Sequence, residues 1–295
     1  MMKRRTFLIK TGAGVALMGA GAFPFRAMAA SGERVKLTIL HTNDLHGQLG
    51  EGSLLPSMVE TIRREEVHVL LFDAGDFVGS GTEEDKRQAV ERMNALGYDA
   101  VILGNQELEW GLETLSQQTK YVSFGVIGSD YPLNSTPLVD WRTPYAVLKK
   151  GGITVGVFGL GADANLLDSN SLNVKSASEG PIARANAFAA RLREQEQCDL
   201  VVCLSHLGFQ YAGARLSDVE LAKQSRGIDL ILGGGTHTFM EGPFMVKNAD
   251  NQEVAIHHAG CDGLLLGRVD VYVEENKGAQ WAAHAGVQGA AARLA

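Results

Sequence analysis

Five short apolar runs along the chain each end in a polar segment. The runs are rich in Val, Ile and Leu and cover Val35–Leu40, Val67–Phe72, Ala100–Leu103, Leu200–Leu204 and Leu230–Leu232. Runs of this length and composition are typical of buried strands. The polar residues that follow them, in order, are Asp44 and His46, Asp76, Asn105, His206, and His237. Because ligands gather at the carboxyl ends of strands in open α/β sheets, we expect these side chains to converge on one metal site.

Helical and strand-like patterns alternate around these runs. Helices are expected over Leu54–Glu66, Asp85–Leu96, Leu112–Gln118, Ile182–Glu196 and Val219–Gln224. Further strands are expected over Val122–Ile127, Tyr145–Lys149, Ile153–Phe158, Met245–Lys247, Val254–His257 and Leu265–Val273. Each half is rich in β–α units and closes in antiparallel strands. This order predicts an α/β fold, a four-layer α-β-β-α sandwich of two mixed sheets.

The N-terminus carries the features of an export signal. Lys3-Arg4-Arg5-Thr6-Phe7-Leu8 is a twin-arginine pattern, the stretch from Thr11 to Phe25 is apolar, and Ala27-Met28-Ala29 fits a cleavage site. We expect residues 1–29 to be a twin-arginine signal peptide outside the fold, which predicts a periplasmic or extracellular protein. A membrane anchor is the alternative, but the apolar stretch is shorter than the ~20 residues of a spanning helix.

The remaining chain is expected to form one domain over residues 35–275, followed by an Ala- and Gly-rich tail over 276–295 that favours a helix or coil. No later segment is long and apolar enough to predict a stable membrane span. The net charge is −7, and the signal region contributes only basic residues. An acidic domain of this kind disfavours nucleic acid as a partner. The three cysteines, Cys198, Cys203 and Cys261, favour free thiols over a disulfide framework.

The motifs at the strand ends also carry a family resemblance. They read His41-Thr42-Asn43-Asp44-Leu45-His46-Gly47, Gly75-Asp76, Gly104-Asn105-Gln106-Glu107, Ser205-His206 and Gly233-Gly234-Gly235-Thr236-His237. In this order they resemble the calcineurin-like metallophosphoesterases, most of all the catalytic domain of bacterial 5′-nucleotidases and UDP-sugar hydrolases. The resemblance runs from Leu37 to about Val273. Any one motif is weak evidence, but five in order, each behind a strand, are strong.

The resemblance implies a role for each candidate ligand. Asp44, His46 and His237 would hold a first divalent metal, and Asp76 would bridge it to a second. Asn105 and His206 would complete the second position. Zn, Mn and Fe all suit such mixed nitrogen and oxygen ligands. A metal pair of this kind activates water for attack on a phosphate ester.

Two residues depart from the family pattern. Gln106 stands where the family has a histidine credited with assisting the leaving group, and it cannot give up a proton near neutral pH. Gly235 stands where the family has a histidine that binds the second metal. We therefore expect one tight metal site and one weakened site, with Asn105 and Gln106 next to the reacting group. Glu107 is expected to support the ligands from behind, and His41 to be a structural hydrogen-bonding residue. For His258 two interpretations stay open: it replaces one of the lost groups, or its strand end faces a polar crevice.

Three interpretations remain open from the sequence. The first is a phosphomonoesterase with weakened activity on nucleotides or similar small phosphates. The second is a catalytically inactive metal- or phosphate-binding module, and the third is a purely structural exported domain. Full-length 5′-nucleotidases carry a second domain that holds the nucleoside, so a separately encoded nucleotide-binding domain is a candidate partner.

Overall fold

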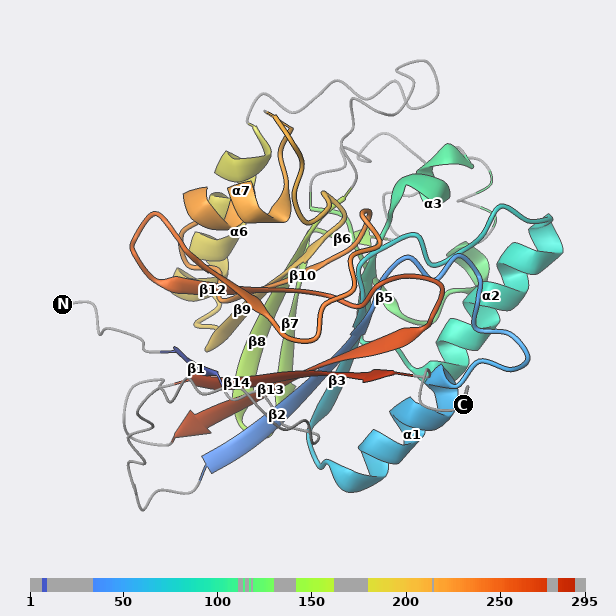
Figure 1. Cartoon of the computed structure of the whole chain (residues 1–295), viewed down its shortest axis with the longest axis horizontal. Coiled ribbons are helices and arrows are strands. Elements are labelled where there is room, and N and C mark those ends of the chain that lie inside the picture. The colour runs from blue at the N-terminus through green and yellow to red at the C-terminus, as the bar shows by residue number, and fades with distance from the viewer. Residues whose placement is uncertain are drawn as a thin grey trace, which may run out of the picture.

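Most of the strands lie in two mixed sheets in the middle of the molecule (Figure 1). The computed structural model describes residues 7–9, 34–110, 114, 117, 119–129, 142–161, 180–213, 215–274 and 281–289. The larger sheet has the order β1-β14-β13-β2-β3-β4-β5-β6. Its strands are β1 (Phe7–Ile9), β2 (Arg34–Thr42), β3 (Val69–Asp73), β4 (Ala100–Ile102), β5 (Gly125–Ile127), β6 (Arg142–Thr143), β13 (Leu265–Glu274) and β14 (Trp281–Gly289).

The smaller sheet has the order β11-β12-β10-β9-β8-β7. Its strands are β7 (Tyr145–Lys150), β8 (Ile153–Leu160), β9 (Leu200–Ser205), β10 (Leu230–Gly233), β11 (Phe244–Lys247) and β12 (Glu253–His258). The larger sheet has a parallel block, β2-β3-β4-β5-β6, with the antiparallel strand β13 beside β2. The smaller sheet has a parallel block, β8-β9-β10-β12, with antiparallel strands β7 and β11 at its two sides. Parallel strands end at the same edge, so the loops that follow them are brought together there.

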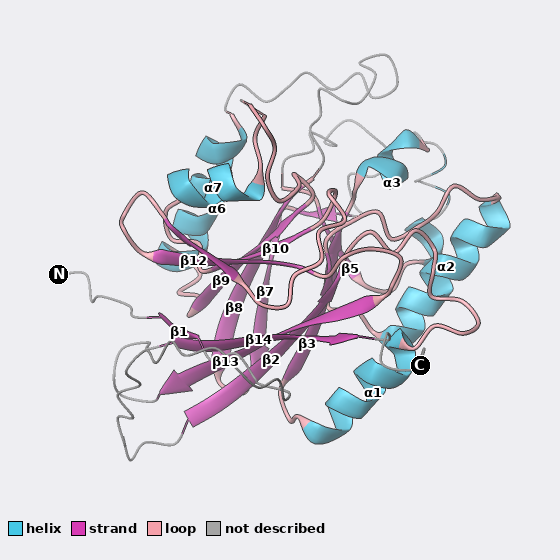
Figure 2. Ribbon diagram, viewed as in Figure 1, coloured by secondary structure: helices cyan, strands magenta, loops and turns pink. Residues whose placement is uncertain are grey.

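Helices cover both outer faces of the sheet pair (Figure 2). They are α1 (Leu55–Glu65), α2 (Glu83–Leu96), α3 (Asn105–Glu109), the 3₁₀ helix η1 (Thr119–Tyr121), α6 (Pro181–Glu194) and α7 (Asp218–Gln224). Side chains of α1 and α2 pack on the outer face of the larger sheet, and those of α6 and α7 on the smaller. A third apolar cluster lies between the sheets and draws residues from both. The predicted four-layer sandwich is confirmed.

Local sequence sets where the helices begin and end. Thr82 and Asp85 form a reciprocal capping box at the start of α2, which satisfies backbone N–H groups that have no partner within the helix. Gly97 ends that helix with φ of 67°, a left-handed conformation that glycine adopts with little strain. Pro181 opens α6, where its fixed φ suits the first helical turn.

Three segments differ from the sequence-based expectation. Asn105 begins the short helix α3, which is absent from the helices expected from the sequence. Trp281–Gly289 form β14 and pair with β13, so the predicted helix or coil over the tail is wrong there. Phe7–Ile9, which we placed outside the fold, pair with β14 in parallel. The remainder of the expected signal peptide, and most of the helix expected over Leu112–Gln118, lie outside the described residues.

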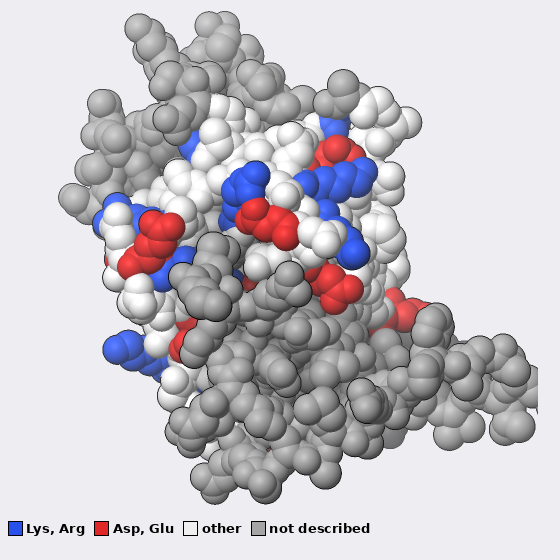
Figure 3. Space-filling view, turned by 90° about the vertical axis from the view of Figure 1, so that its left-hand side faces the viewer, with Lys and Arg blue, Asp and Glu red and all other residues white. Residues whose placement is uncertain are grey.

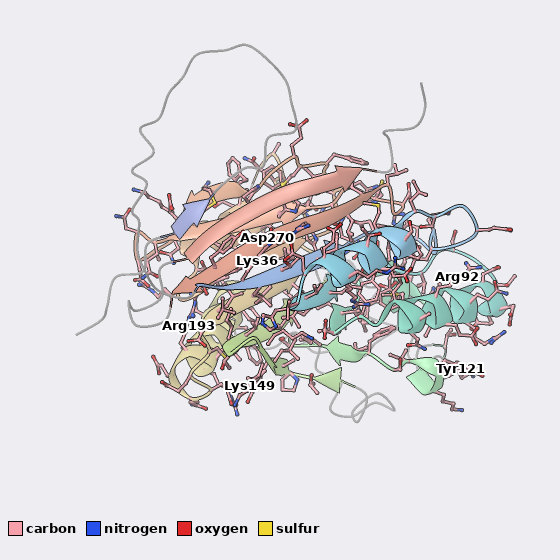
Figure 4. All side chains as sticks on the ribbon, turned by 90° about the horizontal axis from the view of Figure 1, so that it is seen from below. Lys36, Arg92, Tyr121, Lys149, Arg193 and Asp270 are labelled. Atoms are coloured by element: carbon pink, nitrogen blue, oxygen red, sulfur yellow. The ribbon has the colours of Figure 1, made fainter. Side chains whose placement is uncertain are left out.

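Charged side chains are interleaved rather than segregated by sign on the described surface that Figure 3 displays. Basic and acidic side chains also alternate in a network of ion pairs on the larger sheet. Lys36 Nζ lies 3.1 Å from Asp270 Oδ2 (Figure 4). Lys36 also pairs with Glu66, and Arg268 pairs with both Glu66 and Asp270. Cys198, Cys203 and Cys261 form no disulfide with one another, as predicted.

Candidate metal centre

The structure brings the predicted ligands to the carboxyl edge of both sheets. Each follows a different strand: Asp44 and His46 come after β2, Asp76 after β3, Asn105 after β4, His206 after β9 and His237 after β10. The two sheets contribute to one site because their parallel strands end side by side. Within the described residues, the carboxylate and imidazole groups form two overlapping clusters, each compact enough to hold a cation.

The first cluster comprises Asp44, His46 and His237. Asp44 is fully buried, and its Oδ1 lies 3.5 Å from His237 Nε2. The two imidazole rings have centroids 4.9 Å apart. His237 is 48% exposed at its side chain, so this cluster opens to solvent on the His237 side.

The second cluster comprises Asp44, Asp76 and His206, all buried. His206 Nε2 lies 3.3 Å from Asp76 Oδ2 and 3.9 Å from Asp44 Oδ1. His206 Nδ1 donates to the carbonyl of Ala74 at 2.7 Å, which leaves Nε2 as the nitrogen able to bind a cation. The carboxylate common to both clusters is that of Asp44, whereas the sequence-based prediction places the shared carboxylate at Asp76. Which of the two bridges stays a prediction.

Four of the candidate ligands have left-handed backbones. The φ values are 50° at Asp44, 47° at His46, 56° at Asp76 and 49° at His237. Residues other than glycine rarely adopt this conformation, and such strain clusters at functional sites because the surrounding structure must hold it. The strained backbone is therefore an independent sign that these positions serve a site.

Glu107 holds the loops that carry the second cluster. Its buried carboxylate accepts hydrogen bonds from three backbone N–H groups: Asp76 at 2.9 Å, Val78 at 3.0 Å and Gly104 at 2.7 Å. Glu107 thus ties the loop after β3 to the start of α3. These contacts hold the backbone of the candidate ligand Asp76, and the part that Glu107 plays at a metal site stays a prediction.

Asn105 and Gln106 stand at the first turn of α3. The backbone N–H of Gln106 donates to Asp76 Oδ1 at 2.8 Å, which orients that carboxylate. Asn105 Oδ1 and Gln106 Oε1 are buried and form no hydrogen bond within the described part of the chain. Both oxygens are therefore able to accept a hydrogen bond or bind a cation, and the described residues supply neither.

Gly235 lies against the second cluster. Its N–H donates to both carboxylate oxygens of Asp44, at 3.1 Å and 2.9 Å. A Cβ atom added at this position would lie 3.4 Å from His206 Nε2. A side chain at 235 would thus start beside the His206 imidazole, and the glycine contributes no ligand there.

Two further residues contact the candidate ligands and were not singled out from the sequence. Asp262 Oδ1 lies 2.8 Å from His46 Nδ1, and the Asp262 N–H donates to the Asp44 carbonyl at 2.8 Å. Asn43 donates to Asp44 Oδ2 at 2.7 Å and to the Gly260 carbonyl at 2.6 Å. The available signals were the position of Asp262 just after a strand and that of Asn43 inside the first motif.

The other candidate histidines lie behind the site. His41 Nε2 and His257 Nδ1 are 2.7 Å apart, between the two sheets, so His41 is the structural hydrogen-bonding residue that we expected. His258 Nε2 pairs with Asp218 at 2.7 Å, and the other Asp218 oxygen accepts from the hydroxyl of Ser205, next to His206. His258 is thus linked through Asp218 to the residue before His206, and its role at the site stays a prediction.

The electrostatics of the site follow from burial and close charges. Burial lowers the pKa of His206, but the Asp76 carboxylate, 3.3 Å from its Nε2, and the charge of Asp44 outweigh this and raise it to about 9. Burial, together with the charge of Asp76, raises the pKa of Glu107 to about 8. Burial lowers the pKa of His257 to about 4, helped by the neighbouring His258.

The described residues fit a divalent cation. Carboxylate oxygens and imidazole nitrogens are the donors that transition metals bind. Asn105 Oδ1 and His206 Nε2 are buried polar atoms without a hydrogen bond, an arrangement that destabilises a protein unless another group satisfies them. A cation beside Asp44 and Asp76 would do so. By contrast, the groove of about 480 Å³ between α1 and α2 is lined by none of the candidate ligands.

The calcineurin-like phosphoesterase family matches residues 37–239, more than half of the chain. The chain belongs to this family. The match covers all of the motifs quoted above, so the resemblance that they suggested is confirmed. Calcineurin-like phosphoesterases use divalent metals, which agrees with the donor sets at the strand ends.

Among curated proteins, the chain is similar to bacterial and animal phosphoesterases of this family. It is 30% identical to the trifunctional nucleotide phosphoesterase YfkN of Bacillus subtilis over 81% of this chain and 18% of that protein. It is 30% identical to the 5′-nucleotidase of Bos taurus over 81% of this chain and 47% of that protein. The 5′-nucleotidase of Vibrio cholerae is 31% identical over 72% of this chain and 42% of its own length. The chain thus spans about half or less of these relatives.

Solved structures of related proteins share this fold. The 5′-nucleotidase precursor of Thermus thermophilus matches with a TM-score of 0.76 and 25% identity, over 86% of this chain and 54% of that one. The NAD nucleotidase of Haemophilus influenzae matches in fold with a TM-score of 0.73 and 22% identity, over 87% of this chain and 49% of that one. None of the helices among the described residues has the length and apolar character needed to cross a membrane.

Proposed function

We propose that this chain is an exported 5′-nucleotidase-like phosphoesterase that hydrolyses phosphate monoesters, nucleotides or similar compounds, at a reduced rate. The observation that carries the proposal is the convergence of Asp44, Asp76, His206 and His237 where parallel strands of both sheets end. Export by the twin-arginine route, which the N-terminal sequence supports, would place the protein in the periplasm or outside the cell. A nucleotide-binding domain on another chain is a candidate partner.

Each site residue has a defined task in this proposal. Bound divalent ions supply activation of water and neutralisation of phosphate charge. Asp44, His46 and His237 hold the first position, and Asp76, Asn105 and His206 the second. Glu107 and Asn43 fix the loops through the hydrogen bonds described above. Gln106 can donate a hydrogen bond to the leaving oxygen but cannot protonate it, and general acid catalysis is typically worth ~10²–10⁴ in rate.

The same two replacements favour a second candidate function. Gly235 removes a ligand from the second position, and Gln106 removes a proton donor. An inactive protein that binds a metal or a phosphate would retain the Asp44, His46 and His237 cluster and need neither lost group.

Metal analysis combined with a phosphatase assay on the purified full chain tests these functions. We expect roughly one tightly bound equivalent of Zn, Mn or Fe, and a second bound weakly, since the intact donor set lies at the first position. Slow release of phosphate from an aryl phosphate and from a nucleoside monophosphate should stop when a chelator is added.

Two variants sharpen the result. Asp76→Asn should lower metal content more than Asn105→Ala, because it removes a negative charge whereas Asn105 offers a neutral oxygen. Metal binding without hydrolysis of either ester would favour the inactive binding module. Two tight equivalents would contradict the asymmetry, and failure to bind any metal would favour a structural domain.

A further inference from the structure

An exposed aromatic side chain stands beside the metal centre. Phe239 follows the candidate ligand His237 by two residues, and its side chain is 53% exposed. Met240, the next residue along the chain, is buried. An exposed aromatic side chain two residues from a candidate ligand suggests contact with a ligand.

The ring of Phe239 is held in place rather than left loose. It packs on the backbone of Gly260, where an added Cβ would approach Phe239 Cε1 to 2.4 Å. Phe239 also pairs with Ala259 as an isolated β-bridge, and the Gly260 N–H donates to the Thr238 carbonyl at 2.9 Å. A glycine at 260 is therefore required for the ring to occupy this position.

The platform beneath the ring is connected to the metal ligands. Asn43 donates to the Gly260 carbonyl and to Asp44 Oδ2, so one side chain holds both. Asn43 Oδ1 accepts from the Ala259 N–H at 2.8 Å. The backbone of Asp262 in turn donates to the Asp44 carbonyl. These contacts fix the distance between the ring and the Asp44 carboxylate.

We propose that Phe239 forms an apolar platform that binds the organic part of the phosphate ester. His237 is the half-exposed member of the first cluster, so the side on which Phe239 lies is the open side of the site. A flat aromatic group can pack on an aromatic ring with a gain beyond simple area burial. Esters with an aromatic body are thereby favoured over those of small polar alcohols. The inference rests on the proposed phosphate-ester function.

Binding of two phosphonates tests the platform without the need for turnover. Phenylphosphonate and methylphosphonate share a charged head that is not hydrolysed, and differ only in the apolar group. Calorimetric titration of the Mn²⁺-loaded full chain should show tighter binding of phenylphosphonate. Phe239→Ala should weaken phenylphosphonate binding about two- to tenfold and change methylphosphonate binding less than about twofold. Phe239→Trp should keep the preference.

Phe244→Ala is the matched control, because Phe244 is also about half exposed but lies on β11. It should leave both affinities unchanged. Equal weakening of both phosphonates by Phe239→Ala, or no weakening of either, overturns the inference. Wild-type protein that binds and hydrolyses phosphate esters without a phenyl preference would overturn the platform alone. Wild-type protein that binds neither phosphonate would overturn the proposed function as well.

Discussion

Gly235 is the position where a single side chain would change the metal centre most. The Cβ of a histidine there would start 3.4 Å from His206 Nε2, beside the buried second cluster. The same Cβ would lie 3.1 Å from the His206 carbonyl, and the backbone φ is 89°. A restored ligand would therefore come with local strain.

Gly235→His should raise the tightly bound metal from about one to about two equivalents while lowering stability by about 1–3 kcal/mol. Gly235→Ala carries the same backbone strain without a ligand, so it should lower stability and leave metal content unchanged. Elemental analysis and thermal unfolding measure the two effects separately. Equal metal content in the two variants would contradict the assignment of position 235.

Gly235→His combined with Gln106→His should raise phosphomonoesterase turnover at least ~10²-fold, because the pair restores both a ligand and a group that titrates near neutral pH. On an activated aryl phosphate, whose leaving group needs little protonation, Gly235→His alone should raise turnover more than Gln106→His alone. On a nucleoside monophosphate the difference between the two single variants should be smaller. A double variant that binds two metals and stays inactive on both would favour the inactive binding module.

His206 should make metal binding and stability depend on pH. Its pKa in the fold is about 9, against an ordinary value of 6.5. The protonated imidazole therefore stabilises the metal-free fold fully below pH 6.5, and this contribution is lost as pH rises through 9. Glu107, whose pKa is raised to about 8, acts in the same direction. Thermal unfolding of chelator-treated protein should show falling stability between pH 6.5 and 9.

The proton on the His206 imidazole competes with a metal ion for Nε2. Affinity at the second cluster should rise by up to ~tenfold per pH unit below pH 9, with release of a proton on binding. Calorimetry in buffers of different ionisation enthalpy measures that proton. A pH-independent affinity, or stability that rises over this range in the metal-free protein, would show that His206 is neutral in the fold.

Among the elements, the junction of β4 and α3 is the most crowded part of the site. A Cβ added at Gly104 would lie 2.2 Å from Asp76 Oδ1 and 2.4 Å from the Asp76 nitrogen. Gly180, which precedes α6, has no atom within 4 Å of an added Cβ. Both glycines precede a helix and both have negative φ, so they differ in packing rather than in backbone conformation.

Gly104→Ala should therefore destabilise the protein by about 1–3 kcal/mol through overpacking and should reduce metal content by displacing Asp76. Gly180→Ala should change neither property appreciably. Chemical denaturation and elemental analysis of the two variants provide the comparison. Normal metal content in Gly104→Ala would indicate that the loop after β3 relaxes without moving the carboxylate.

The strands that carry the ligands could be predicted because their burial leaves a continuous apolar signature. Phe72 and Leu204, for example, are fully buried in a sheet, and polar residues follow each run. Helix α3 escaped prediction because five residues give no usable periodicity. Strand β14 escaped because its Ala- and Gly-rich sequence holds a single β-branched residue, Val287, too few for the pattern by which strands are recognised.

Within the site, the ligand candidates could be named from motifs but their mutual support could not. Asp262 reaches His46 across more than two hundred positions, and no local pattern marks that contact. The pairing of His258 with Asp218 likewise depends on how α7 packs on the smaller sheet. Contacts of this kind arise from tertiary structure and leave little trace in a single sequence.

At the scale of the whole molecule, β14 covers the backbone edge of β13 that would otherwise be open to pairing. The two strands pair over eight residue positions, from Leu265 with Gly289 to Tyr272 with Ala282. A chain that ends after Glu274 would leave β13 as a sheet edge with unpaired backbone groups, which promotes association between molecules. We expect this truncation to shift the protein toward larger species in size-exclusion chromatography, whereas a chain ending after Gly289 should elute as the full chain does. Identical elution of both would contradict a protective role for β14.

The left-handed backbones at Asp44, His46, Asp76 and His237 affect how any mutational scan of this centre should be interpreted. Alanine at these positions removes a donor and also introduces a residue that is poorly suited to positive φ, so the measured loss combines two effects. Asparagine tolerates this conformation far better. Comparing asparagine, alanine and glycine at each position would separate the contribution of the ligand from that of the chain that holds it.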